Sequence, residues 1–533
     1  MRTIFVLGAG IMQIPALRIA KERGWRVVAA DGSDKAAGIP YVDEFVHIDL
    51  KDRPALEEAA RRLKETGGLD GVMTAGTDFS ASVAWVAEKL GLPGIPFETA
   101  LDASDKSRMR SVFSAAGVPS PRFYVLSRSE SLSGLPDFLA FPLVVKPVDN
   151  MGARGCRLVR NEAELAQALS DAHEHSRSGR AIVEEYLEGP EFSLDALVHE
   201  GRITLCGVAD RHITFAPYFV EMGHTMPTAY PEKDVAEVVR VFEAGIRALG
   251  IRNGAAKGDI KLTSRGGYVG EIAARLSGGY MSGWTYPYAS GVDPAAGALD
   301  IAVGIAPRDL TPKREWVSAE RAFISIPGAV LLVAGERTAR AEPYVKEVFF
   351  RVGSGDRVVF PANNVEKCGN VISQAPDRAS AVEAAERAAR AVRIRLAPRN
   401  PDTDAFLAGG GIPDSDGTTW PPSAFRVAPA LAAAASALPD RGLAAVPAPG
   451  ARSASGSRHR IAYAVLPSAR EETSRDWQGR TIAESLSVVE DWTGIVPDDG
   501  RAEVVLGAAF WKALFRGGCQ GAAYVVDSLT RID

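Results

Sequence analysis

The chain has 533 residues, of which 46% are hydrophobic and 24% are charged, and its formal net charge is −5. A chain of this length exceeds what one hydrophobic core supports, so we expect a soluble globular protein of about two to four domains. The small net charge provides no general attraction for nucleic acid or for an anionic membrane, and no stretch approaches the roughly 20 apolar residues that span a bilayer. Any bound anion therefore needs a local site.

The N-terminal residues and the cysteines indicate the compartment. The start, MRTIFVLGAGIMQIP, is interrupted by glycine and proline and lacks a plausible cleavage site, so it fits a strand and turn better than a signal peptide. The cysteines, at positions 156, 206, 368 and 519, show no paired spacing, which argues against a zinc site or a disulfide framework. We expect a cytoplasmic protein with small-molecule substrates and no nucleic-acid or membrane partner, and a homodimer is the assembly that we consider.

The first domain is predicted over residues 1–96. Residues 3–7 (TIFVL), 25–31 (WRVVAAD) and 71–76 (GVMTAG) have the apolar character of buried strands, and helical patterns separate them. Strands that alternate with helices through short turns indicate a parallel, Rossmann-like sheet covered by helices.

The turn after the first strand resembles half of a dinucleotide-binding fingerprint. Gly8 and Gly10 follow that strand, and Asp31 ends the next one. Gln13 stands where the third glycine is required, so a structural turn is the stronger interpretation and a nicotinamide oxidoreductase is an alternative.

The second glycine-rich loop fits a phosphate-binding site better than the turn after the first strand does. Lys146 ends a predicted strand in FPLVVKP, and DNMGARG follows with Gly152 and Gly155. Backbone N–H groups of such a loop can close over phosphate oxygens while a nearby ammonium supplies the counter-charge. The loop lacks the Walker sequence. A surface hairpin without a ligand is the competing interpretation.

Two carboxylates follow in one predicted hairpin, KGDIKLTSRGGYVGEIAARLSGG. A three-residue loop of Ser264, Arg265 and Gly266 would place Asp259 directly opposite Glu271, whereas a two-residue loop would send them to opposite faces. Carboxylates that face each other repel unless a cation lies between them. Two solvated acids on a polar sheet face are the alternative.

The C-terminal part changes in composition. Residues 400–458 are rich in alanine, proline, serine and glycine, which predicts a linker with at most one alanine-rich helical turn. Residues 459–533 regain strand and helix patterns, and we expect a small β-α-β-α-β unit of unknown role, with a last strand in AAYVVDSL.

The order of these motifs resembles the ATP-grasp superfamily. Lys106 in ASDKSRMR, Lys146 with its glycine loop, the VEEYLEGPE segment and the two hairpin carboxylates occur in the order and spacing of that family. The resemblance covers roughly residues 1 to 395. It implies an α/β fold with a Rossmann-like pre-ATP-grasp domain, an ATP-grasp α+β domain over residues 97–399, and then the linker and the small C-terminal α/β domain.

The resemblance also implies roles for individual residues. Lys106 and Lys146 would contact the ATP phosphates under a lid formed by residues 150–155, which include Gly152 and Gly155. Asp259 and Glu271 are similar to the metal ligands of the family, for Mg²⁺ with Mn²⁺ as an alternative. The remaining implied contacts are adenine for Glu184 and the Leu187 backbone, ribose for Glu191, and the reacting phosphoryl group for Arg275.

The reaction that fits the resemblance is the ATP-dependent activation of a carboxylate as an acylphosphate, which an amine then attacks. Ala273 replaces an asparagine that many members use as a further metal ligand, but EIAAR is similar to bacterial L-amino acid ligases. His224 in FVEMGHTMP is a candidate to orient a substrate carboxylate or to act as a base.

Three alternatives stay open beside a carboxylate–amine ligase. They are a purine-biosynthetic or carboxylase-type enzyme of the same fold, a non-catalytic nucleotide-binding module that Ala273 motivates, and the oxidoreductase described above.

Overall fold

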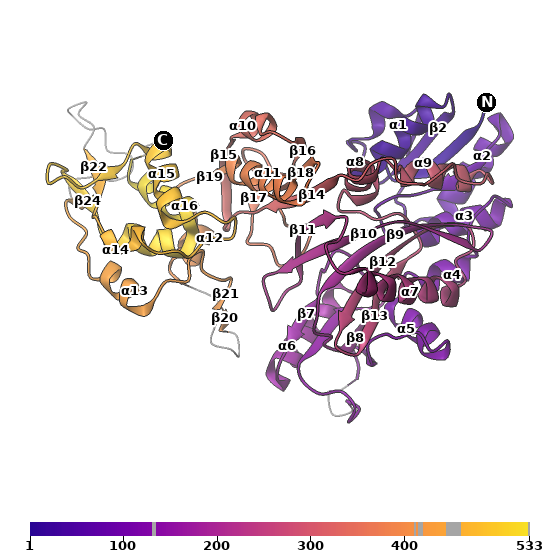
Figure 1. The fold of residues 1–533 in the computed structure, drawn as a ribbon, viewed down its shortest axis with the longest axis horizontal. Helices are drawn as coiled ribbons and strands as arrows, with labels where there is room; N and C mark the ends of the chain where they lie inside the picture. Colours follow the sequence, from indigo (N-terminus) through magenta and orange to yellow (C-terminus); the bar gives the residue numbers. More distant parts are fainter. Residues whose placement is uncertain (131–134, 410–411, 414–418, 444–459, 531–533) are drawn as a thin grey trace. The chain divides into compact units, whose positions relative to one another are not determined.

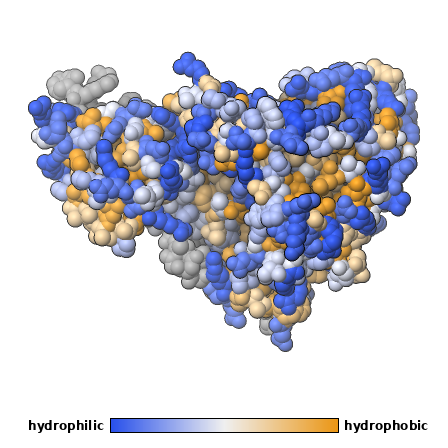
Figure 2. Space-filling view, in the orientation of Figure 1, coloured by the Kyte–Doolittle hydropathy of each residue, from blue (hydrophilic) through white to orange (hydrophobic). Residues whose placement is uncertain are grey.

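The computed structural model describes residues 1–130, 135–409, 412–413, 419–443 and 460–530. These divide into two compact units, one of residues 1–320 and 372–382, the other of residues 321–371 and 383–533. Within the described residues, none of the helices combines the length and the apolar character that a membrane span needs. The face drawn in Figure 2 carries mainly hydrophilic residues with smaller hydrophobic patches between them. The predicted α/β class is confirmed.

A four-stranded parallel sheet opens the first unit (Figure 1). Its strand order is β3-β2-β1-β4, and residues 4–7 and 27–30 are fully buried, as their apolar runs predict. The elements are β1 (Thr3–Leu7), η1 (Ile11–Gln13), α1 (Ile14–Glu22), β2 (Arg26–Asp31), η2 (Ile39–Tyr41), β3 (Glu44–His47), α2 (Arg53–Gly67), β4 (Gly71–Met73), α3 (Ser80–Leu90), α4 (Phe97–Asp102) and α5 (Lys106–Ala115).

A second, antiparallel sheet carries the glycine loop. Its order is β5-β8-β6-β7, and α6 packs its apolar side against the sheet. The elements are β5 (Phe123–Ser127), β6 (Leu143–Pro147), β7 (Arg157–Val159), α6 (Glu162–His175) and β8 (Arg180–Glu185).

The largest sheet of the first unit is antiparallel in its central strands and has the order β13-β12-β9-β10-β11-β14-β18. Helix α7 covers β12 and β13 through a core that contains Phe242, Ile246 and Ile260. The elements are β9 (Glu191–His199), β10 (Arg202–Thr214), β11 (Val220–Met226), α7 (Glu232–Leu249), β12 (Gly254–Thr263), β13 (Gly266–Ala273), η4 (Met281–Thr285), α8 (Tyr286–Ser290), α9 (Pro294–Ala302), β14 (Val317–Phe323) and β18 (Gly369–Ala375).

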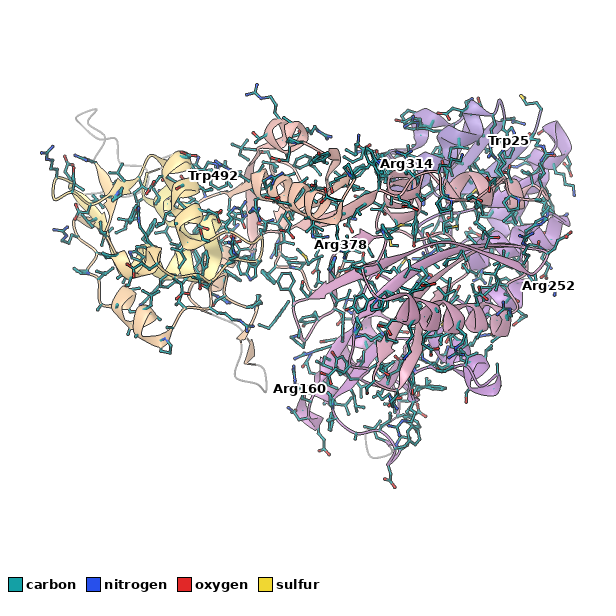
Figure 3. The ribbon with its side chains drawn as sticks, in the orientation of Figure 1. Trp25, Arg160, Arg252, Arg314, Arg378 and Trp492 are labelled. Atoms are coloured by element: carbon teal, nitrogen blue, oxygen red, sulfur yellow. The ribbon has the colours of Figure 1, made fainter. Side chains whose placement is uncertain are left out.

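Contacts near Arg378, labelled in Figure 3, tie chain segments of the first unit together. Arg378 begins α11 (Arg378–Ala391), donates to the Pro227 carbonyl at 2.9 Å and forms an ion pair with Asp210. β14, β18 and α11 each contribute residues to both units.

The second unit combines short strands with a long C-terminal helical segment, which is kinked at Gly518. The remaining elements are β15 (Gly328–Ala334), α10 (Glu336–Ala341), β16 (Val345–Phe350), β17 (Arg357–Val358), β19 (Arg393–Leu396), α12 (Pro401–Leu407), β20 (Ile412–Pro413), β21 (Thr419–Trp420), α13 (Pro429–Ser436), β22 (Ile461–Tyr463), α14 (Pro467–Arg470), α15 (Ile482–Thr493), β23 (Val496–Pro497), β24 (Val504–Leu506) and α16 (Ala508–Thr530). Three of these strands form a parallel sheet of order β23-β22-β24.

The expected last strand in AAYVVDSL is wrong, because these residues belong to α16. Cys519, Ala522 and Val526 are buried in one core at helical spacing, and Asp527 pairs with Arg395 on β19 at 2.5 Å. Tertiary packing therefore outweighs the β-branched local pattern.

The predicted linker is structured where it is described. Residues 400–409 contain α12 and residues 419–443 contain α13, the alanine-rich helix, in which Leu431 and Ala435 are buried in the core of the second unit. Residues 410–411, 414–418 and 444–458 of this segment lie outside the described residues. The predicted domain limits stay predictions.

Candidate active site

The β12–β13 hairpin places Asp259 directly opposite Glu271, although the expected turn is wrong. Thr263 pairs with Gly266, so the loop has two residues, and that register alone would separate the two carboxylates. A bulge restores the pairing, because Ile260 pairs with Val269 and leaves Gly270 as an extra residue. A Cβ atom at Gly270 would lie 3.0 Å from the Asp259 carbonyl oxygen, so the bulge favours glycine.

Asp259 belongs to a polar stripe across neighbouring strands. Ser193, its partner on β9, donates from Oγ to Asp259 Oδ1 at 2.9 Å. Arg211 Nη1 lies 3.2 Å from Oδ2, and Lys257 also pairs with that oxygen. Burial alone would raise the pKa of Asp259, but Arg211 and Lys257 hold it below its ordinary value. The carboxylate is therefore ionised at neutral pH.

Glu271 is ionised as well and faces a cluster of cations. Its side chain is 34% exposed, and its Oε1 lies 3.4 Å from Lys106 Nζ. Burial opposes ionisation, but Lys106, Lys257 and Lys146 together lower the pKa of Glu271 to about 2. Two ionised carboxylates on one face of a ribbon suit a hard divalent cation.

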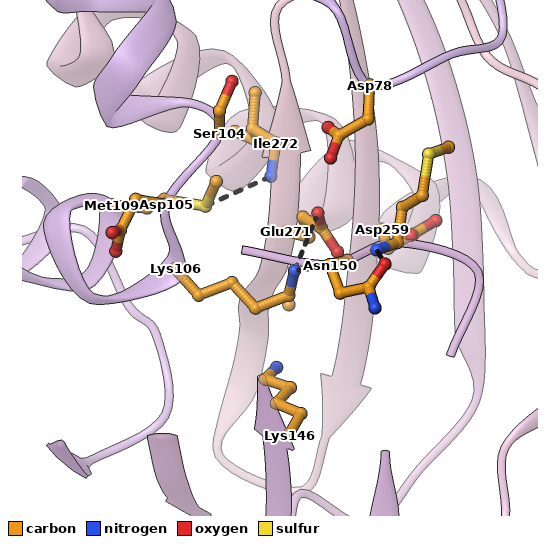
Figure 4. Close-up of polar contacts among 12 residues, drawn as sticks. Asp78, Ser104, Asp105, Lys106, Met109, Lys146, Asn150, Asp259, Glu271 and Ile272 are labelled. Atoms are coloured by element: carbon orange, nitrogen blue, oxygen red, sulfur yellow. Dashed lines mark hydrogen bonds and ion pairs between the residues drawn. The ribbon is translucent and has the colours of Figure 1, made fainter. Parts of the chain in front are cut away.

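Lys106 connects this hairpin to the glycine loop, as Figure 4 shows. It stands at the N-terminus of α5, and its Nζ donates to the Asn150 carbonyl at 2.8 Å. Burial would lower the pKa of Lys106, but Glu271 and Asp78 raise it above its ordinary value. The ammonium is therefore charged beside the loop that is predicted to cover phosphate.

Glycine backbone conformations shape that loop. Gly152 and Gly155 have φ angles of 69° and 67°, and a Cβ atom at Gly155 would lie 3.0 Å from His175 Cβ. Both positions therefore favour glycine.

Lys146 and Glu184 form a buried ion cluster with Arg110. Glu184 accepts from Lys146 Nζ at 2.7 Å and from Arg110 Nε at 2.8 Å. Burial would raise the pKa of Glu184, but Arg110 and Lys146 lower it. Arg110 Nη2 also donates to the Gly270 carbonyl at 2.6 Å, so the cluster holds the hairpin bulge as well. The structure thus gives the Glu184 side chain a positioning role, and its predicted adenine contact stays a prediction.

The predicted adenine and ribose contacts lie on the segment between β8 and β9. Leu187 is buried at 5% exposure in the connection after β8. Glu191 begins β9, pairs with Arg211, and lies 3.7 Å from Lys261 Nζ. Arg211 therefore joins Glu191 to Asp259.

Arg275 and Asp78 border the carboxylate pair. Arg275 Nη1 donates to the Leu276 carbonyl at 3.0 Å, and its Nε is buried without a hydrogen-bond partner among the described residues. Burial raises the pKa of Asp78, while Lys106 and Arg275 oppose that rise and Glu271 adds to it. An unsatisfied buried donor at this place fits an anionic ligand.

His224 lies in a buried acidic cluster of the first unit, and Arg211 links this cluster to Asp259, because Arg211 Nε donates to Glu221 Oε2 at 2.8 Å. The Nδ1 atom of His224 is 2.8 Å from Glu320 Oε2, and its Nε2 is 3.5 Å from Glu221 Oε2. Burial would lower the pKa of His224, but Glu221 and Glu320 raise it to about 9. A protonated imidazole cannot accept a proton, so the geometry favours the orienting role of His224 over the base role.

The glycine turn after β1 offers little room for a dinucleotide. The Gln13 side chain packs over Gly8, where an added Cβ atom would lie 3.0 Å from Gln13 Cδ. Asp31 accepts from the Ala9 N–H at 2.8 Å and from the Ser33 N–H at 2.9 Å. The residues of the half-fingerprint therefore already pack against and hydrogen-bond with nearby protein groups, which disfavours the oxidoreductase alternative.

Four site residues were missed in the sequence, although two carry a periodic signal. Arg110 stands one helical turn after Lys106, and Lys257 stands two strand positions before Asp259, so each shares the face of a predicted site residue. Arg211 stands between Asp210 and His212 on β10, in a polar run that gives no alternating signal. Asp78, in the loop after β4, has no local signal of this kind.

Family comparisons agree with this arrangement. The ATP-grasp N-terminal domain matches residues 17–94, the ATP-grasp domain matches residues 139–283, and the L-amino acid ligase C-terminal domain 2 matches residues 322–397.

Individual relatives match parts of the chain. Protein y4rH of Sinorhizobium fredii, described as uncharacterized, is 26% identical over 67% of this chain and 74% of its own length. Carnosine synthase 1 of Gallus gallus is 30% identical over 57% of this chain, but the match covers only 36% of that relative. The crystal structure of L-amino acid ligase from Bacillus licheniformis has a TM-score of 0.68 at 21% identity, over 74% of this chain and 99% of that chain, which shows a shared fold. From the three family matches and the hairpin geometry together, the chain belongs to the ATP-grasp superfamily of ligases.

Proposed function

We propose that this protein is an ATP- and Mg²⁺-dependent ligase that activates the carboxylate of a small acid, an amino acid or a related compound, and joins it to an amine. The observation that carries the proposal is the pairing of Asp259 with Glu271 beside Lys106. The L-amino acid ligase C-terminal domain and the similarity to carnosine synthase support an amino acid substrate.

In this proposal Asp259 and Glu271 hold the divalent ion, which would neutralise charge on the ATP phosphates. Lys106 and Lys146 provide further positive charge from α5 and β6. The acid's carboxylate oxygen bonds to the γ-phosphorus, the bond to the β-phosphate oxygen breaks, and ADP leaves. The 150–155 loop excludes water, which would otherwise hydrolyse the acylphosphate.

The second step is amide bond formation. The amine nitrogen bonds to the acyl carbon, the carbon–oxygen bond to phosphate breaks, and inorganic phosphate leaves. We propose that Arg275 binds the phosphoryl oxygens, since its Nε is a buried donor without a partner among the described residues. Asp78, whose pKa burial raises, is the proposed acceptor of the amine proton. His224 orients an anionic group of a substrate.

Release of ADP from ATP and Mg²⁺, screened over pools of amino acids, tests this function. We expect ADP release that depends on the acid, with the joined product identified by mass spectrometry. Tight ATP binding without ADP release in any pool would instead support a non-catalytic nucleotide-binding module. Bicarbonate-dependent turnover without an amino acid would support a carboxylase.

A further inference from the structure

The first unit contains a cavity whose lining is largely distinct from the residues of the proposed reaction. It has a volume of about 460 Å³, within the range of small-molecule pockets, which is about 300 to 1,000 Å³. Its described lining includes none of the proposed nucleotide, metal or phosphoryl ligands, namely Lys106, Lys146, Asp259, Glu271 and Arg275. Asp78 is the one proposed reaction residue in its wall.

The cavity lies where a parallel sheet usually binds ligands. Lys51 and Arg53 follow β3, and Asp78 follows β4, so these residues stand beyond the carboxyl ends of the two edge strands of one parallel sheet. The opposite wall comes from the base of the antiparallel sheet, with Asp149 after β6 and Arg177 before β8.

The lining is cationic. Five basic side chains face three acidic ones, and the basic residues are Lys51, Arg53, Arg108, Arg177 and Arg180. The N-terminal residues of α3 also line the cavity, and this helix has no side-chain cap, which adds a partial positive charge.

The three acidic side chains of the cavity already have hydrogen-bond donors or cationic partners within the protein. Asp149 accepts from Ser176 Oγ at 2.8 Å and from the Ser178 N–H at 2.7 Å, and these hydrogen bonds hold its pKa down against the effect of burial. Asp105 pairs with Arg180 at 2.5 Å, and Asp78 lies 3.7 Å from Arg177 Nη2. Arg108 also pairs with Glu98 and Asp102, which do not line the cavity, so two of the five cations remain without compensation.

Lys51 and Arg53 are those cations. Among the described residues neither side chain forms an ion pair, and Arg53 Nε is buried without a hydrogen-bond partner. The Arg53 guanidinium carbon lies 5.0 Å from the centre of the Phe97 ring, so the ring packs against this side chain. A buried donor without an acceptor is costly, and an anion in the cavity would satisfy it.

We propose that this cavity is a binding site for a small molecule that carries a dianionic group, either a phosphate ester or a polycarboxylate. Lys51 and Arg53 bind the anionic group, and Arg177 and Arg180 close the opposite side. The volume exceeds that of one phosphate ion, so the natural ligand extends beyond its anionic group. The site does not require the ligase activity proposed above, because its residues bind the anion without nucleotide.

Calorimetric titration of the full chain without nucleotide tests this site, with inorganic phosphate and tricarballylate as the two probes. A phosphate-ester ligand predicts binding of phosphate, and a polycarboxylate ligand predicts binding of tricarballylate. We expect the double variant Lys51→Ala, Arg53→Ala to weaken that binding by at least about tenfold, as loss of charge-assisted hydrogen bonds implies.

One control variant separates this site from other sources of anion binding. Arg62→Ala removes the same charge from the exposed side of α2 and should leave binding unchanged. The proposal is overturned if neither probe binds, if the Lys51 and Arg53 variant binds as wild type, or if the control loses binding equally. None of these outcomes depends on turnover.

Discussion

The variant Glu184→Gln should destabilise the region that holds Lys146. Glu184 lies 2.8 Å from Arg110 and 2.7 Å from Lys146, and the three side chains are 3%, 0% and 15% exposed. At an effective dielectric constant of about 20, each attraction is about 6 kcal/mol before the desolvation cost is subtracted. Removal of one member of a buried pair typically costs about 3 to 5 kcal/mol, and we expect a loss of that size in local unfolding free energy.

The neighbouring residue provides a matched control. Glu185 pairs with Arg122 and Arg265, whose side chains are 55% and 52% exposed. Water screens such pairs, so Glu185→Gln should cost less than about 1 kcal/mol.

Hydrogen exchange of the β8 and α5 amides is the suitable assay, because a chain with two compact units has no single unfolding free energy. The pKa of Glu184 is lowered from 4.5, so its contribution is complete above pH 4.5 and is lost as pH falls through the folded-state pKa. The difference in local unfolding free energy between wild type and Glu184→Gln should therefore shrink only below pH 4.5. A loss of local unfolding free energy in Glu184→Gln below about 1 kcal/mol, or one equal to the loss in Glu185→Gln, would refute the reasoning.

Two further variants test other parts of the site. Gly270→Ala should displace the hairpin bulge, because the new Cβ atom would lie 3.0 Å from the Asp259 carbonyl oxygen. We expect acid-dependent ADP release to fall by at least about tenfold while the circular dichroism spectrum stays unchanged. A wild-type rate of ADP release would show that the bulge does not position Asp259. The pKa of His224 is raised from 6.5 to about 9, so its charge stabilises the fold fully below pH 6.5 and this contribution is lost as pH rises through about 9. The melting temperature of His224→Gln should therefore lie below that of wild type at pH 6.5 and approach it above pH 9. A difference in melting temperature that is constant with pH would exclude a charged His224 paired with Glu221 and Glu320.

Much of the fold could be predicted because its signals are local. The buried runs of β1 and β2 and the glycine loop after Lys146 are confirmed at their predicted places. The pairing of Asp259 with Glu271 was predicted for the wrong reason, because a bulge at Gly270 produces it. The Gly270 carbonyl accepts from Arg110, which lies 160 positions away in sequence.

The rest depends on tertiary contacts that no local pattern encodes. The pairing of Glu184 with Arg110 joins residues 74 positions apart, and the acidic partner Glu320 lies 96 positions from His224. Likewise, residues 522–529 are helical because they pack in the core of the second unit, although their β-branched composition favours a strand.

The central claim is that Asp259 and Glu271 together hold a divalent ion beside the ATP phosphates. Binding of Mn²⁺, followed by electron paramagnetic resonance in the presence of a non-hydrolysable ATP analogue, tests it most directly. The surface variant Glu243→Gln, which alters an exposed pair with Arg247, is the control. We predict that Glu271→Gln abolishes turnover, keeps the fold and weakens Mn²⁺ binding by at least about tenfold, while the control binds as wild type. Wild-type Mn²⁺ affinity in Glu271→Gln would contradict the account.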